Sequence, residues 1–90
     1  MVTIDRAVEI AQESLAKVMP SFSKLNPSVE EFRLSERGGE WLITFRAANP
    51  EPVERPHGMG SVFMPFIEKI VEVEVADGTL RSVRNPTFDF

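Results

Sequence analysis

Few residues in this 90-residue sequence could carry out chemistry. It contains one histidine, His57, and neither cysteine nor tyrosine. A serine nucleophile would need His57 as its base and a carboxylate to orient that base. His57 lies in the segment "RPHGMG", where proline and glycine predict a loop. We therefore expect an exposed loop histidine and no enzyme activity, and an enzyme that uses His57 remains an alternative.

Metal and cofactor sites also lack their usual residues. A single histidine without cysteine does not supply the ligands of the common zinc sites. Glu72 and Glu74 would share one face of a strand and could reach a hard cation. Arg81 is expected opposite Glu74, however, which favours an exposed ion pair. The "GMG" segment does not lie between a strand and a helix, as a phosphate-binding loop must. The sequence thus predicts neither a metal nor a cofactor.

The arginines could form a basic patch if the two predicted hairpins described below are neighbours. They are Arg33, Arg46, Arg81 and Arg84. Glu31, Glu72 and Glu74 would share that face, which favours ion pairs over a nucleic-acid site. The net charge of −4 also argues against general nucleic-acid binding, because such binding needs a basic surface.

Length and composition predict a single domain over residues 1–90. The chain is 42% hydrophobic and 27% charged, which is ordinary for a globular protein. Its first residues carry charges throughout and do not resemble a secretory signal. The longest apolar run, "VFMPFI", is far shorter than the roughly 20 residues that span a bilayer. We expect a cytoplasmic location without membrane contact.

Apolar residues at spacings of three and four predict an amphipathic helix over residues 4–18, with Thr3 as its N-cap. The apolar stripe consists of Ile4, Ala7, Val8, Ala11, Leu15, Val18 and Met19. A helix this short is marginal alone in water, so its stripe must dock on another element. Residues 20–28 are predicted to form a loop, beneath which Phe22 and Leu25 pack.

Two hairpins are predicted after the helix. In the first, residues 29–47, a turn at Gly38-Gly39 would place Leu34 opposite Ile43. The apolar face of this hairpin would carry Phe32, Leu34, Trp41, Ile43, Phe45 and Ala47, beneath the helix. A loop one residue longer would turn Leu34 to the other face, unless a bulge compensates.

The second hairpin, residues 69–84, would turn at Asp77-Gly78 and place Val75 opposite Leu80. Its buried face would consist of Val71, Val73, Val75 and Leu80, and its other face of Glu72, Glu74, Arg81 and Val83. Residues 48–61 form the longest irregular segment, and residues 62–67 fit either a strand or a short helix. These elements predict an α+β fold: one N-terminal helix packed on one face of an antiparallel sheet of four to five strands.

The order of these elements resembles the PepSY-like family of small domains. The matching residues are Trp41 and Phe45 in the central strand, and the V-x-V-x-x-x-D-G-x-L-x-S-V ending from Val73 to Val83. The resemblance implies no catalysis and a domain that binds or restrains other proteins, often peptidases, usually outside the cytoplasm. This chain differs by its long Pro-Gly loop, and its first residues are not expected to be an export signal. Small immunity-protein domains have a similar order of elements.

An apolar surplus near the end of the chain suggests a function. The surplus consists of Met59, Val62, Phe63, Met64, Phe66, Ile67, Phe88 and Phe90. Not all of these side chains fit beneath one helix. They therefore form either a larger core, a tail folded over the open sheet face, or a partner surface. The candidate partner-binding residues are His57, Met59, Phe63, Met64, Phe66, Phe88 and Phe90. We predict a protein-interaction or inhibitor-like regulatory module that binds a protein partner or a second copy. The alternative is a small-molecule pocket between helix and sheet, lined by Met19, Trp41, Phe45 and Met64.

Overall fold

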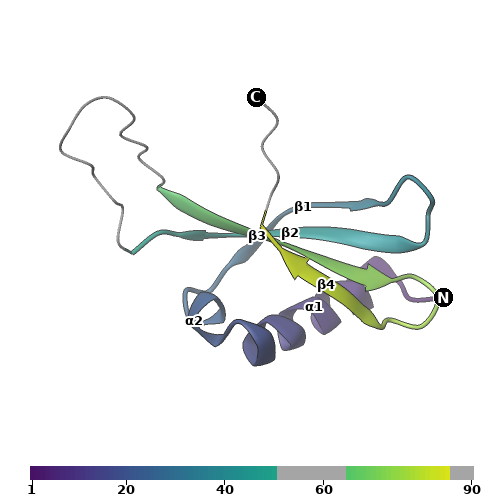
Figure 1. Cartoon of the computed structure of the whole chain (residues 1–90), viewed down its shortest axis with the longest axis horizontal. Coiled ribbons are helices and arrows are strands. Elements are labelled where there is room, and N and C mark those ends of the chain that lie inside the picture. The colour runs from purple at the N-terminus through teal and green to yellow at the C-terminus, as the bar shows by residue number, and fades with distance from the viewer. Residues whose placement is uncertain (51–64, 86–90) are drawn as a thin grey trace.

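A computed structural model describes residues 1–50 and 65–85, and within them two helices lie on one side of an antiparallel sheet (Figure 1). The elements are α1 (Ile4–Val18), α2 (Pro20–Ser23), β1 (Ser28–Leu34), β2 (Glu40–Ala48), β3 (Phe66–Glu74) and β4 (Leu80–Arg84). The strands lie in the order β1-β2-β3-β4. The predicted α+β fold is confirmed, with four strands rather than five in the described residues.

Helix α1 has the predicted bounds because its cap and its apolar stripe agree. The Thr3 side chain accepts a hydrogen bond from the Arg6 backbone amide at 3.3 Å. Ala7, Ala11 and Leu15 are buried against the sheet. The small alanines let the helix approach the strands closely, so most of the stripe docks as expected. Val18, which was predicted to belong to the stripe, is 57% exposed.

The segment after α1 differs from the prediction in one respect. Residues 20–23 form the short helix α2 rather than a loop. Pro20 stands at its start, where proline is compatible with a helix because the first backbone amides lack helical partners. Phe22 is buried and Leu25 packs against the core, as predicted.

The core lies between α1 and strands β2, β3 and β4, and β1 extends beyond it. The largest fully buried side chains are Phe45, Leu15, Ile43, Val71 and Val73. Phe32 and Leu34 were expected in this core, but 54% and 47% of their surface is exposed. Helix α1 packs mainly over the other three strands. Val29 at the start of β1 still packs against the core, but within residues 1–50 and 65–85 the side chains of Phe32 and Leu34 remain about half exposed.

The first hairpin has its predicted faces but a different register. Leu34 pairs with Trp41, and Phe32 rather than Leu34 pairs with Ile43. The turn spans residues 36–39 rather than Gly38-Gly39 alone, because the Ser35 amide donates to the Glu40 carbonyl at 2.9 Å. The longer loop keeps parity, so the same residues share the apolar face.

The second hairpin differs from the prediction by a bulge. Val71 pairs with Val83, and Val73 pairs with Leu80, which leaves Arg81 unpaired in the ladder. Val83 was expected on the polar face, but it packs against the core. The predicted pair of Val75 with Leu80 is wrong, since β3 ends at Glu74.

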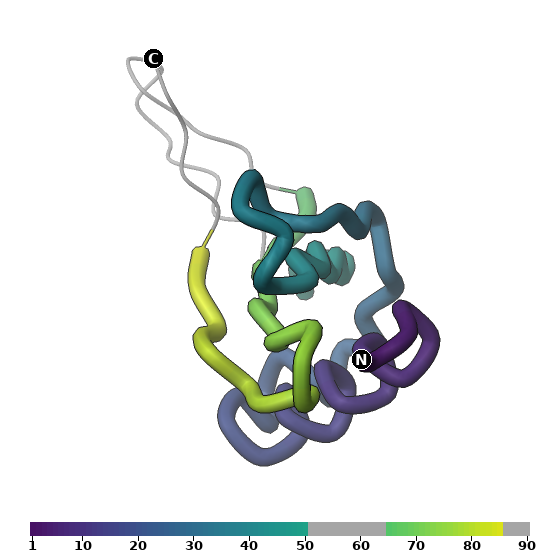
Figure 2. The backbone as a smooth tube through the Cα atoms, turned by 90° about the vertical axis from the view of Figure 1, so that its right-hand side faces the viewer, coloured from purple at the N-terminus to yellow at the C-terminus, as the bar shows by residue number. Residues whose placement is uncertain are grey.

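Both tight turns lie at the same end of the molecule as the start of the chain (Figure 2). The Val75 amide donates to the Gly39 carbonyl at 3.0 Å, and the Val2 amide donates to the Val75 carbonyl at 2.7 Å. The Trp41 indole N–H donates to the Val2 carbonyl at 3.1 Å. These bonds join the first residues to both hairpins and hold α1 in place.

Candidate functional site

Among the described strands, β1 is an edge of the sheet and pairs with β2 alone. Its inward groups are identified by Ser35, whose amide bonds to Glu40 of the facing strand. Alternation along an antiparallel ladder directs the backbone groups of Glu31 and Arg33 inward in the same way. The backbone amides and carbonyls of Phe32 and Leu34 therefore point outward, away from β2.

The side chains of β1 divide by chemistry between the two faces of the sheet. Phe32 and Leu34 project to the face that carries the helices, beyond the reach of α1. Glu31 and Arg33 project to the opposite face with 64% and 60% of their side-chain surface exposed. The Arg33 Nε lies 3.6 Å from the Glu31 Oε1, which is a loose pair in water.

A bulge in β1 marks the N-terminal limit of its exposed, regularly paired part. The pairing of β1 with β2 shifts between Val29 and Glu31, so Glu30 is the extra residue. The Glu30 carboxylate turns to Arg46, whose Nη1 lies 3.3 Å from its Oε1. Residues 31–34 thus pair regularly with β2 on their inner side, while no described strand lies on their outer side, and we call them the β1 edge.

The face opposite the helices carries ion pairs, as predicted, and the predicted pair of Glu74 with Arg81 is among them. The Arg46 Nη2 lies 3.0 Å from the Glu68 Oε1. The Arg46 Cζ lies above the ring of Phe66, 5.1 Å from the ring centroid. Arg84 lies 3.0 Å from Glu72. Arg81 reaches Glu74 at 3.0 Å and Glu40 at 3.7 Å, although it stands at the bulge. Charges of both signs alternate here, and each arginine named here lies beside an acid.

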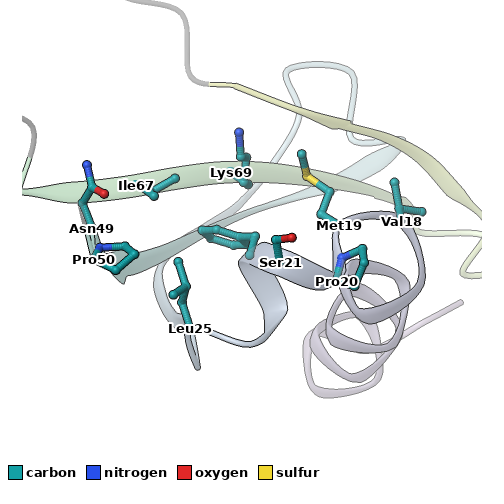
Figure 3. A pocket seen from close by; sticks show the side chains of 10 residues that line it. Val18, Met19, Pro20, Ser21, Leu25, Asn49, Pro50, Ile67 and Lys69 are labelled. Atoms are coloured by element: carbon teal, nitrogen blue, oxygen red, sulfur yellow. The ribbon is translucent and has the colours of Figure 1, made fainter. Parts of the chain in front are cut away.

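A hollow of about 720 Å³ opens between the helices and the far ends of β2 and β3 (Figure 3). It is lined by Val18, Met19, Pro20, Ser21, Phe22, Leu25, Asn49, Pro50, Ile67 and Lys69. The lining is mostly apolar, and the Lys69 amine at its rim donates a hydrogen bond to the Asn85 side chain. An apolar group could fill this space.

The predicted small-molecule pocket is only partly recovered in this hollow. Met19 lines it, but Trp41 and Phe45 do not. Phe45 is fully buried in the core, and the Trp41 indole is bonded to the first residues of the chain. Met64 lies outside the described residues.

Of the predicted partner-binding residues, the structure describes Phe66. It is the first residue of β3, lies beneath Arg46 on the face opposite the helices, and is 48% exposed. The other candidates lie outside the described residues and stay predictions: His57, Met59, Phe63, Met64, Phe88 and Phe90.

Sequence reasoning missed Phe32 and Leu34 as surface residues, although a signal was present. A helix with its side chains is about 10 Å wide, whereas neighbouring strands lie about 4.8 Å apart. One long helix therefore covers two or three strands of a four-stranded sheet. One apolar edge had to remain open unless another segment covered it.

In residues 1–50 and 65–85, no helix is long and apolar enough to cross a membrane. The same residues bring together no group of three or more side chains of the kinds that ligate metals. Comparison with family models, curated proteins and solved structures found no match for this chain. The resemblance to PepSY-like domains stays a prediction, and function must be argued from the geometry.

Proposed function

We propose that this chain is a non-enzymatic protein-interaction module that binds its partner along the β1 edge. The observation that carries the proposal is the exposure of Phe32 and Leu34 beside outward backbone groups. Unpaired edges attract other strands, and natural proteins usually shorten, charge or cover them. This edge carries the charges of Glu31 and Arg33 on one face but leaves two large apolar side chains exposed on the other.

A partner strand added to β1 would satisfy both features at once. Its backbone would bond to the outward groups of Phe32 and Leu34, as in recognition by β-strand addition. Its side chains would cover the same two residues on the helix-bearing face. Burying the exposed half of each side chain contributes roughly 1 kcal/mol. The pair therefore supplies affinity, and the backbone bonds supply orientation.

The test is site-specific photo-crosslinking in the native host. A photoreactive phenylalanine analogue replaces Phe32, and a matched control carries it in place of Ala16, an exposed residue of α1. We expect a discrete covalent adduct from position 32 and none from position 16. Equal, diffuse labelling from both positions, or no adduct from position 32, would overturn the proposal.

The hollow beside α2 supports a second candidate, the binding of a small apolar molecule. Its size is within the range of ligand pockets, and Lys69 at the rim could attract an anionic head group. Straight-chain fatty acids are suitable probes, and the measurement is the shift in melting temperature. We expect stabilisation that a Met19→Trp substitution, which places a larger ring in the hollow, reduces. Unchanged melting with chains of every length would rule this candidate out.

A further inference from the structure

We infer that the partner at the β1 edge is a second copy of this chain, paired antiparallel with Phe32 opposite Phe32 of the second copy. This inference rests on the proposed function and names its partner. A twofold axis through the edge would then make the two four-stranded sheets one continuous sheet. Both helix layers would lie on the same face of it.

The charges of the edge favour self-pairing. Glu31 and Arg33 flank Phe32 with opposite signs, so this register places each beside its complement in the second copy. The backbone groups of Glu31 and Arg33 point to β2, so these two residues do not exchange backbone hydrogen bonds with the second copy. In such non-hydrogen-bonded pairs the opposing side chains approach most closely. The two acids and two arginines form a patch of alternating sign.

The backbone of the edge selects the same register. Phe32 points its amide and carbonyl outward, so the central pair exchanges both backbone hydrogen bonds. An axis at Arg33 would instead oppose two arginines, which destabilises a strand pair. Charge therefore favours the Phe32-centred register over its neighbour.

The outer part of the pairing is also compatible with this register. Leu34 lies opposite Glu30 of the second copy, whose carboxylate is engaged by Arg46 and turned away. Phe32 and Leu34 of the two copies then fill the strip between the two helix layers. The surface that α1 leaves uncovered in one copy is covered by the same surface of the other.

The experiment is sedimentation equilibrium of the full chain over a concentration series. The wild type is expected to show a monomer–dimer equilibrium. Glu31→Arg and Arg33→Glu each place like charges opposite in two symmetry-related pairs, so each is expected to raise the dissociation constant about tenfold. An equimolar mixture of the two variants brings opposite charges together again, and is expected to form a 1:1 heterodimer.

The controls come from the adjacent turn. Glu36→Arg and Arg37→Glu change the net charge by the same amounts at exposed positions outside the edge, and should dimerise like the wild type. Circular dichroism checks that all four variants are folded.

Three results would overturn the inference: a monomeric wild type at every concentration, dimerisation unaffected by Glu31→Arg, or a mixture no tighter than its components. In each case an adduct between position 32 and a different protein would leave the proposed function standing. Absence of that adduct would remove both.

Discussion

The two edges of the sheet differ in how far their apolar side chains are covered. Strand β4 has five residues, a bulge at Arg81, and two apolar residues, Leu80 and Val83, that pack against the core. Strand β1 has seven residues and presents its apolar side chains to solvent. The difference follows from where α1 crosses the sheet, since the helix covers β4 and leaves Phe32 and Leu34 of β1 exposed.

The two tight turns repeat this contrast. Gly78 in the β3–β4 turn and Gly38 in the β1–β2 turn both have positive φ angles, of 77° and 72°. A side chain at Gly78 would lie 2.7 Å from the Ile10 Cδ1 atom and 3.3 Å from the Val2 Cγ2 atom, whereas a side chain at Gly38 would meet nothing within 4 Å. The β3–β4 turn, which α1 covers, needs glycine both because space is limited and because the φ angle is positive. The uncovered β1–β2 turn needs glycine only for its positive φ angle.

The largest expected effect tests the two turns. Gly78→Ala combines a strained backbone with overpacking and should lower the free energy of unfolding by about 3 kcal/mol. Gly38→Ala has only the backbone strain and should cost about 1 kcal/mol. Urea denaturation measures both. Equal losses would show that the end of the Ile10 side chain moves aside at little cost.

A smaller effect compares the edges through one residue type. Leu80→Ala removes a side chain packed against the core and should cost about 2 kcal/mol. Leu34→Ala removes an exposed side chain and should cost less than about 1 kcal/mol in the monomer. Urea denaturation at low protein concentration makes the comparison. A larger loss for Leu34→Ala would mean that the monomer covers β1.

The smallest effect concerns Asp77 in the covered turn. Hydrogen bonds from the Thr79 side chain and backbone amide lower the pKa of Asp77 below its ordinary value of 3.8. Because the folded pKa is the lower one, this contribution to stability is present above the unfolded value and is lost as pH falls through the folded value.

Asp77→Asn keeps the acceptor oxygen but removes the charge. The wild type should therefore be slightly more stable than Asp77→Asn near neutral pH, and the difference should vanish in strong acid. Thermal melting across the pH range measures it. A difference that does not change with pH would show that the carboxylate charge is irrelevant to the turn.

Local signals predicted most of the fold. The bounds of α1 and its Thr3 cap follow from spacing and capping chemistry, and both are confirmed. The faces of the first hairpin were also correct, because a turn longer by two residues preserves parity. What failed was register, since Ser35 and Glu40 close the loop earlier than the two glycines suggested. Their side chains also bond to each other at 2.8 Å.

The remaining differences come from packing between distant parts of the chain. The bulge at Arg81 turns Val83 to the core, and no local pattern indicates it. Phe32 and Leu34 alternate like core residues, so their exposure becomes evident only once the width of α1 is compared with that of the sheet. The candidate site therefore lies where the apolar alternation of β1 extends beyond the part of the sheet that α1 covers.

The long β2–β3 ladder ends in a hydrogen bond of 2.9 Å from the Asn49 amide to the Pro65 carbonyl. Nine paired positions hold the two strands together behind it, so the chain leaves and re-enters the sheet at one point. The entropic cost of closing a loop rises only by about 0.6 kcal/mol for each doubling of its length. Foreign peptides or a fluorescent reporter can therefore be inserted between Asn49 and Pro65 at little entropic cost. This end of the molecule lies opposite both tight turns (Figure 1).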